Sequence, residues 1–409
     1  MSDLCFPIFL EAISEQISLF KNEIDDLEKK IDVHNTVGTA NIKVVGVGGG
    51  GQNAVNRMYK ERVEGVEYIS VNTDSQALEH SEIPLKLRVG DQTARGLGVG
   101  GDPAKGRQCH EEDREEIKSV LEGADLVFIA AGMGGGTGTG GAPVVAEISK
   151  EIGALTVGVV TKPFNFEGKV RKTKALEGVE ALKEQVDTLI VIPNDRLTAV
   201  SDANVTIQTA FKMADDVLRQ GIQSIAELIL CPGEINLDFA DVKAVMDGAG
   251  AAWMAIGKGS GENRAVEAAE EALQSPLLEV EVTGAKGVIF NVTGGPDVTI
   301  HEVQTASEIV ASTVHPDANI IYGQTTDPKM ENEIKITLIA TGFPSANDVE
   351  EDEIKNASEV LSGDKGMIEI PPFLRNHPRC RKFAFSTRKK ATVQSRKGLQ
   401  KPVPVSCTV

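Results

Sequence analysis

The sequence predicts an α/β fold in which a parallel sheet is followed by a long helix, a second α/β unit and a disordered C-terminal tail. Short apolar, β-branched runs alternate with helical segments, and two glycine-rich loops directly follow such runs. Near-continuous apolar strands separated by helices are typical of a parallel sheet that is covered on both faces. The expected strands of the first unit are 42–47, 66–72, 124–131, 154–160 and 187–193.

A long helix and a second α/β unit are predicted after these strands. Residues 204–230 keep a helical periodicity, which ends at the breaker cluster Cys231-Pro232-Gly233. Apolar runs then alternate again between strand and helix patterns. The expected order is strand 251–257, helix 261–275, strand 286–293, helix 299–313, strand 318–324 and strand 333–342.

The N-terminal segment carries a heptad pattern. Apolar residues recur from Leu10 to Ile31 at alternating spacings of three and four. This pattern predicts either a coiled-coil seam or the buried face of an amphipathic helix, and the sequence does not decide between them. The polar face holds more acidic than basic residues, which disfavours binding to anionic lipid. Residues 33–40 are expected to form a linker, so residues 1–38 are expected to be a heptad-patterned helix and linker that precede the first domain.

Charge and composition exclude several classes of protein. The net charge is −18, yet residues 375–409 hold ten Lys and Arg and no Asp or Glu, so residues 1–374 carry −28. An acidic body with only 4% aromatic residues is not expected to bind nucleic acid. Five scattered cysteines and the lack of a signal peptide or a membrane-length apolar run predict a cytoplasmic protein.

The first glycine-rich loop, Gly46 to Gly51, lies between a predicted strand and a predicted helix. Its G-x-G-x-x-G spacing is the dinucleotide-fold fingerprint, because glycine lets backbone N–H groups approach a phosphate at a helix N-terminus. Asp74 stands near the position expected for a ribose-binding acid. Taken alone, this loop is compatible with an NAD-dependent oxidoreductase or with a tight structural turn.

The second glycine-rich loop, residues 131–143, argues against a dinucleotide. Two separate loops at the carboxyl ends of strands suit a nucleotide with several phosphates, held from two sides. Thr137 and Thr139 add hydroxyls that are expected to reach phosphate oxygens. The chain contains no GxxxxGK[ST] motif and its loops are poor in lysine, so backbone amides and a metal ion are expected to neutralise the phosphates.

These motifs resemble those of the tubulin/FtsZ family, which includes the bacterial cell-division GTPase FtsZ. The resemblance runs from Ile42 to about Gly342 and includes GVGGGG, VNTD, GGGTGTG, TKPFNFEGKVR, IPND, NLDFADV and SPLLE. It implies a Rossmann-like GTPase domain with a central helix (39–230) and a C-terminal α/β domain (231–343). Gln52 interrupts the family's glycine run, and we expect its side chain to crowd the phosphates.

The resemblance further implies a site for GTP or GDP with Mg²⁺. Phe211 would stack on guanine, and Asp215 would accept hydrogen bonds from guanine N1–H and the 2-amino group, which adenine lacks. Glu167 and Arg171 resemble a ribose- and phosphate-contacting pair, with a surface ion pair as the alternative. The other implied contacts are Gly48, Gly49, Gly50, Gly51, Asn53, Asp74, Gly100, Gly101, Gly134, Gly135, Gly136, Thr137, Gly138, Thr139 and Asn194.

In this family the catalytic acids come from a neighbouring subunit. The matching residues here are Asn236, Asp238 and Asp241, although Asp238 and Asp241 would equally suit a helix N-cap and first turn. The implied activity is GTP hydrolysis at the junctions of a head-to-tail filament that forms the cytokinetic ring. A structural relative that assembles with little hydrolysis is the alternative.

The terminal segments indicate binding to partners rather than a catalytic role. Residues 344–366 form an acidic linker, and residues 367–409 hold a terminal peptide and the basic tail. Within them, Ile368 to Arg375 resembles the family's docking peptide for membrane tethers and division regulators. The basic tail would bind an anionic membrane surface, lie against acidic filaments or have no function. The implied location is the division site, on the inner face of the membrane.

Overall fold

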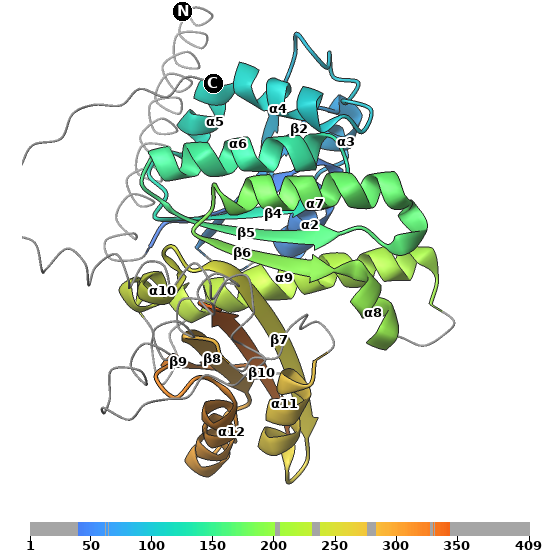
Figure 1. Cartoon of the computed structure of the whole chain (residues 1–409). Helices are drawn as coiled ribbons and strands as arrows, with labels where there is room; N and C mark the ends of the chain where they lie inside the picture. Colours follow the sequence, from blue (N-terminus) through green and yellow to red (C-terminus); the bar gives the residue numbers. More distant parts are fainter. Residues whose placement is uncertain are drawn as a thin grey trace, which may run out of the picture. The chain divides into compact units, whose positions relative to one another are not determined.

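The computed structural model describes residues 40–61, 63, 65–200, 205–230, 238–275, 284–327, 330 and 332–343. These residues form one ten-stranded sheet in the order β3-β2-β1-β4-β5-β6-β7-β10-β8-β9, with helices on both faces (Figure 1). The α/β class predicted from the sequence is confirmed. The expected N-terminal helix, acidic linker, terminal peptide and basic tail lie outside the described residues.

The first half of the sheet consists of six parallel strands. Five of them match the expected ranges to within two residues, and the short edge strand β3 was not predicted. The strands are β1 (Ile42–Val47), β2 (Val66–Asn72), β3 (Leu85–Arg88), β4 (Leu126–Gly132), β5 (Leu155–Lys162) and β6 (Thr188–Pro193).

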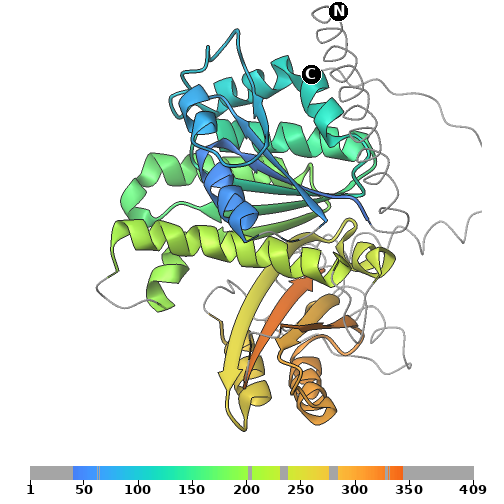
Figure 2. The same cartoon turned by 180° about the vertical axis from the view of Figure 1, so that it is seen from behind.

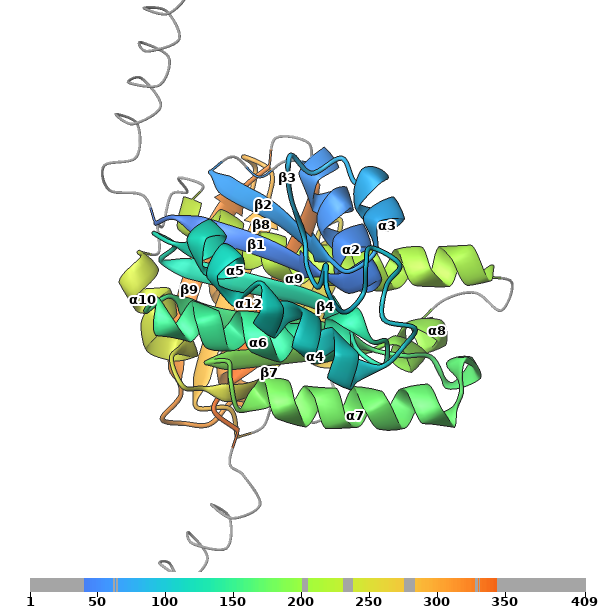
Figure 3. The same ribbon diagram turned by 90° about the horizontal axis from the view of Figure 1, so that it is seen from above.

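Helices cover both faces of these strands, as Figure 3 shows from above. All six residues of β1 are buried, because alternate side chains enter two different hydrophobic cores. Val44 packs in the core formed with α2 and α9, whereas Val45 packs in the core formed with α4 to α7. The helices are α2 (Gly48–Lys60), α3 (Ser75–Glu79), α4 (Pro103–Glu112), α5 (Arg114–Leu121), α6 (Thr137–Glu151), η1 (Asn165–Glu167), α7 (Lys169–Lys183), α8 (Asn194–Val200) and α9 (Ile207–Leu230).

The second half of the sheet has mixed direction. β10 pairs antiparallel with β7 and β8, whereas β8 and β9 are parallel. The two halves are continuous through a short parallel pairing of 188–190 in β6 with 250–252 in β7. The elements are α10 (Phe239–Met246), β7 (Gly250–Ser260), α11 (Arg264–Leu273), β8 (Gly287–Gly294), α12 (Ile300–Thr313), β9 (Asn319–Thr326) and β10 (Glu333–Thr341).

Helix α9 runs between the two halves of the sheet, as Figure 2 shows. Its buried residues recur at helical spacing, which explains why the sequence pattern identified this helix. A Cβ atom on Gly221 would lie 2.9 Å from the sulfur of Met254, so this glycine allows α9 to approach β7. Among the described residues, no helix is long and apolar enough to cross a membrane.

Candidate functional site

The two glycine-rich loops touch each other at the carboxyl ends of β1 and β4. Gly48 has a φ of +69°, and a Cβ atom built on it would lie 2.7 Å from the backbone nitrogen of Gly138. A Cβ atom on Gly51 would lie 2.0 Å from the carbonyl oxygen of Ala130. Glycine is required at these positions because any side chain would overlap with backbone. The contact brings the N-termini of α2 and α6 together.

Other glycines of the same region face open space. For Gly49, Gly100, Gly101 and Gly135, no described heavy atom outside the adjoining backbone lies within 4 Å of where a Cβ atom would be. The loop 96–102 packs on the second glycine loop, since a Cβ atom on Gly136 would lie 2.8 Å from the backbone nitrogen of Asp102. Three loops therefore meet at this end of the sheet, and each has glycine backbone with open space beside it; we call this loop cluster the cradle. Exposed backbone N–H groups at two helix N-termini suit an anion such as phosphate.

The two threonines of the second loop have different surroundings. Thr139 is 3% exposed, and its hydroxyl accepts a hydrogen bond from the backbone N–H of Gly134 at 2.8 Å. Thr139 therefore holds the loop in shape, which the sequence did not predict. The half-buried Thr137 shares a 2.7 Å hydrogen bond with the hydroxyl of Thr73, at the end of β2. Asp74 follows directly and caps α3 by accepting from the backbone N–H groups of Gln76 and Ala77.

The expectation that Gln52 crowds the phosphates is wrong. Its side chain is 3% exposed and hydrogen-bonded at both ends. The Nε2 atom donates to the carbonyl oxygen of Ala77 at 2.5 Å, and the Oε1 atom accepts from Asn72 at 2.8 Å. The amide therefore ties α2 to β2 and α3. Asn53, the next residue of α2, is exposed.

Aromatic side chains line the end of α9 that lies beside the cradle. Phe211 is 39% exposed and stands edge-on to Phe164 and Phe166, at ring-centroid distances of 5.4 and 6.3 Å. Phe164 and Phe166 stack on each other at 5.1 Å. The sequence motif PFNFEG contains both of these rings, but nothing in it predicts their contact with α9. The partly exposed Phe211 ring is available for stacking against a planar group.

Asp215 lies one helical turn after Phe211 and is mostly buried. Its Oδ2 atom lies 3.4 Å from the Nε atom of Arg57 on α2. Burial raises the pKa of Asp215 from 3.8 to about 6, against the lowering effect of Arg57; the nearby Asp216 adds a smaller rise. Arg57 was not predicted as a site residue, because only the packing of α2 on α9 brings it to this carboxylate.

Glu167 and Arg171 connect this aromatic region to the cradle, and Asn194 begins the nearby helix α8. Asn194 is 4% exposed, and its Oδ1 atom has no hydrogen-bond partner among the described residues. A buried acceptor without a partner is costly, so a ligand donor at this atom would be favourable. Glu167 accepts from the backbone N–H of Phe164 at 2.9 Å and pairs with Arg171 at 3.0 Å. The Cγ atom of Arg171 lies 2.7 Å from where a Cβ atom on Gly134 would be.

The predicted catalytic acids lie at the other end of the parallel strands. Asp238 caps α10 by accepting from the backbone N–H of Asp241 at 2.8 Å, and both residues are exposed. The carbonyl oxygen of Met246, in the last turn of α10, accepts from the hydroxyl of Thr188 at the start of β6. Figure 1 accordingly shows α10 beside the starts of the strands, whereas the cradle lies at their ends. Asn236 lies outside the described residues.

No metal cluster appears in the part of the chain that the structure describes. In particular, no group of three or more His, Cys, Asp or Glu side chains there is arranged to hold a metal ion. Mg²⁺ in nucleotide sites is usually held by one or two carboxylates together with phosphate oxygens. Asp74, beside Thr73 and Thr137, is a carboxylate at the edge of the cradle that fits such a minimal set.

Comparison with known proteins gives two family matches that together cover most of the described chain. Residues 41–202 match the GTPase domain of the tubulin/FtsZ family, and residues 250–344 match the C-terminal domain of the FtsZ family. An FtsZ dimer from M. jannaschii is 46% identical, with a TM-score of 0.73 over 77% of this chain and 92% of that one.

Two more distant structures share the fold. CetZ1 from Haloferax volcanii, solved as a GDP-bound monomer, is 20% identical with a TM-score of 0.66 over 78% of this chain and 99% of that one. CetZ2 from the same organism, solved as a GTPγS-bound protofilament, is 20% identical with a TM-score of 0.64 over 79% of this chain and 99% of that one.

Proposed function

Because this chain belongs to the tubulin/FtsZ family, we propose that it is an FtsZ-type GTPase that forms head-to-tail filaments of the cytokinetic ring. One observation carries the proposal. The cradle and the exposed acids Asp238 and Asp241 lie at opposite ends of the same parallel strands. A single copy therefore holds the two parts of a hydrolytic site too far apart to use them together. The family match argues against the alternative, an NAD-dependent oxidoreductase.

The cradle binds the phosphates of GTP or GDP in this proposal. Backbone N–H groups around Gly49 and Gly135 approach the phosphate oxygens, because no side chain fills the space in front of them. Gly100 and Gly101 border the same space from a third loop. When bound beside Asp74, Mg²⁺ would neutralise negative charge on the terminal phosphates.

The aromatic region selects guanine. Phe211 presents a partly exposed ring, and Asp215 presents an acceptor where guanine has the N1–H and 2-amino donors. Adenine would leave the buried carboxylate without donors, which disfavours it. Asn194 provides a second acceptor, whose Oδ1 atom has no partner among the residues that the structure describes. Glu167 and Arg171 hold the ribose and the phosphates between the aromatic region and the cradle.

Asp238 and Asp241 act in the cradle of the next copy. There they orient the attacking water in line with the terminal phosphate, while Asn236 completes the pocket. Such a contact joins two different faces of the protein and does not close, so it builds a filament. Hydrolysis then weakens the junction between the two copies.

The terminal segments connect the filament to its surroundings. We propose that Ile368 to Arg375 binds membrane tethers and division regulators, and that the filament lies at the division site on the inner face of the membrane. The acidic charge of residues 1–374 disfavours a nucleic-acid partner. The basic tail offers a second contact with anionic lipid.

GTP turnover per subunit across a range of protein concentrations, with pelleting in parallel, tests the proposal. We expect a concentration threshold below which turnover vanishes and above which polymer sediments. Turnover that does not depend on concentration would contradict the shared site. Pelleting with little turnover would identify the structural relative that assembles without hydrolysis.

A further inference from the structure

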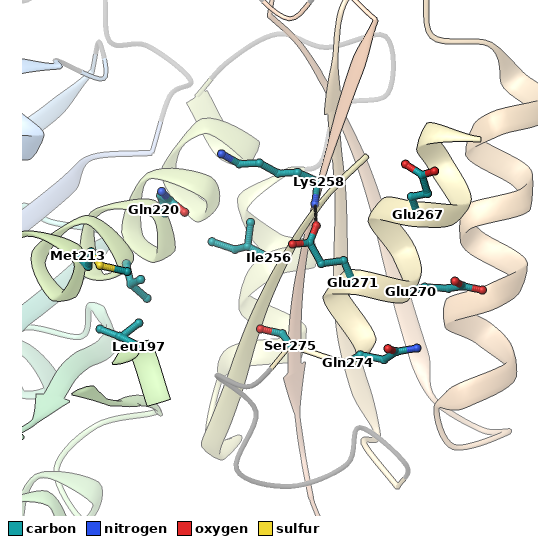
Figure 4. Close-up of a pocket in the computed structure, with 11 residues that line it drawn as sticks. Leu197, Met213, Gln220, Ile256, Lys258, Glu267, Glu270, Glu271, Gln274 and Ser275 are labelled. Carbon is teal, nitrogen blue, oxygen red and sulfur yellow. Dashed lines mark hydrogen bonds between the residues drawn. The ribbon is translucent and has the colours of Figure 1, made fainter. Parts of the chain in front are cut away.

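Lysine side chains beside an open space usually extend into water, because a charged ammonium loses favourable hydration when it is buried. Lys258 of β7 follows this rule. It borders a groove of about 680 Å³ that is also lined by residues of α9 and α11 (Figure 4). The hydrogen bond drawn there joins the backbone N–H of Lys258 to Glu271 at 2.6 Å, while the lysine side chain itself is exposed.

Lys174 of α7 departs from this rule. Its side chain is only partly exposed, and its ammonium donates to the backbone carbonyl oxygen of Gly101 at 2.6 Å. The two residues are 73 positions apart in the sequence, so the bond depends on the tertiary structure. It joins α7 to the loop 96–102, which is the third loop of the cradle.

The same face of α7 packs on the second glycine-rich loop. The Cγ atom of Arg171 lies 2.7 Å from where a Cβ atom on Gly134 would be, and a Cβ atom on Gly178 would lie 2.3 Å from the Cγ2 atom of Thr139. Lys174 lies between these two contacts at helical spacings of three and four, so it shares their face. Helix α7 is therefore fixed against one loop of the cradle while Lys174 holds another.

The loop that Lys174 holds contains a turn built from glycine. The backbone N–H of Asp102 donates to the carbonyl oxygen of Val99 at 3.2 Å and closes the turn. Its central residues, Gly100 and Gly101, have φ values of +60° and +75°. Positive φ at both central positions is typical of a type I′ turn. Glycine adopts this turn at little cost but allows other shapes as readily, so a contact from outside is needed to select one.

Backbone contacts hold the loop on either side of this turn. The N–H of Gly98 donates to the carbonyl oxygen of Thr73 at 3.2 Å before the turn, and Asp102 caps α4 directly after it. The two glycines between these points have open space beside them. The bond from Lys174 is the contact that fixes the carbonyl group of Gly101 itself.

We propose that Lys174 is a positioning residue of the cradle, whose ammonium holds the Gly101 carbonyl and so keeps the turn 99–102 in the shape that receives phosphate. The inference rests on the proposed function, since a nucleotide in the cradle is what gives this shape a role. Lys174 acts through Gly100 and Gly101 and leaves the catalytic acids unchanged. Release of the turn lowers the fraction of binding-competent protein, and apparent nucleotide affinity falls by that fraction.

Hydrogen–deuterium exchange of the full-length protein without nucleotide tests the hold on the turn. We expect Lys174→Met to make the amides of Gly98 and Asp102 exchange roughly tenfold faster, which is the effect of losing one hydrogen bond from a charged donor. Lys174→Arg keeps a cationic donor and should restore slow exchange. Equal exchange in Lys174→Met and the unmodified protein would overturn the proposal.

The matched control is Lys172→Met. It removes the same charge two residues away on α7, where the ammonium of Lys172 donates to the side chain of Asn165 at 3.1 Å instead of to the loop. Exchange of Gly98 and Asp102 should stay unchanged in this variant. Equal acceleration by both lysine substitutions would overturn the proposal, since it would mean a general effect of charge on α7.

Nucleotide binding and steady-state turnover test the consequence for the cradle. Lys174→Met should weaken GDP binding and raise the KM for GTP by roughly 3- to 10-fold, with kcat changed less than about twofold. Lys174→Arg should restore both values. Faster exchange with unchanged affinity and KM would overturn the positioning role. If the unmodified protein binds neither GDP nor GTP, the proposed function fails, whereas the exchange experiment still decides whether Lys174 holds the turn.

Discussion

The two ends of the parallel strands differ in both chemistry and packing. At the carboxyl ends, glycine backbones touch one another at some positions and have open space beside them at others. At the other end, Asp238 and Asp241 occupy an ordinary helix N-terminus and are exposed. The first region is distinguished by the conformation and contacts of its backbone. The second region is distinguished only by its acidic side chains. Under the proposed function, one copy binds the phosphates of the nucleotide by itself, and a second copy is needed to hydrolyse GTP.

The strongest test of this division is removal of one acid. We expect Asp241→Ala to lower GTP turnover by about 10²-fold or more, which is the usual contribution of a positioned acid or base. GDP and GTP affinity should stay unchanged, because Asp241 is remote from the cradle of its own chain. Steady-state turnover and nucleotide binding measure the two effects. Asp247→Ala, at the C-cap of the same helix, is the matched control and should turn over normally.

A second test separates the two kinds of glycine in the first loop. Gly51→Ala places a Cβ atom 2.0 Å from the carbonyl oxygen of Ala130, so we expect a loss of about 2–4 kcal/mol in the free energy of unfolding. Gly49→Ala meets no described atom and should change that free energy by less than about 0.5 kcal/mol, yet weaken GDP binding. Denaturant melts without nucleotide, followed by GDP titration, measure both. Equal destabilisation by the two substitutions would contradict the claim that Gly49 has open space beside it in the cradle.

A third test addresses the base. Asp215→Asn should weaken GDP binding by roughly 10- to 100-fold, because a hydrogen bond to a charged acceptor contributes about 1.5–3 kcal/mol. ADP binding should change far less, so the ratio of GDP affinity to ADP affinity should fall. Asp216→Asn, at the neighbouring half-exposed position, is the control. An unchanged ratio of GDP to ADP affinity would remove Asp215 from the site.

The smallest expected effect is a change in how stability and GDP affinity depend on pH. The pKa of Asp215 is raised to about 6 by burial. Because the folded protein holds this proton more tightly than the unfolded chain does, the contribution of Asp215 to stability falls as pH rises from about 4 to 6. Guanine binding needs the carboxylate, so GDP affinity should instead fall as pH drops below about 6. Arg57→Gln should move that midpoint to higher pH, and calorimetric titration of GDP from pH 5 to 8 would detect it.

Some of the site was predictable because its signal is local. Gly48 to Gly51, the second glycine loop and α9 each follow from spacing within a short stretch of sequence. The roles of the Thr139 and Gln52 side chains were harder to predict, and the expectation for Gln52 was wrong. Their hydroxyl and amide are directed by partners elsewhere in the fold, so the residue type alone does not determine whether they face a ligand or the interior.

The sequence by itself determined nine of the ten strands and helix α9, because strand and helix periodicity and the demand for glycine are encoded within a few residues. The tertiary structure decided which elements meet. It brought Arg57 to Asp215 from another helix, left the Asn194 acceptor without a partner among the described residues, and placed Asp238 at the opposite end of the strands from the cradle. These outcomes depend on contacts between distant segments and on burial, neither of which is set by the residues adjacent in sequence.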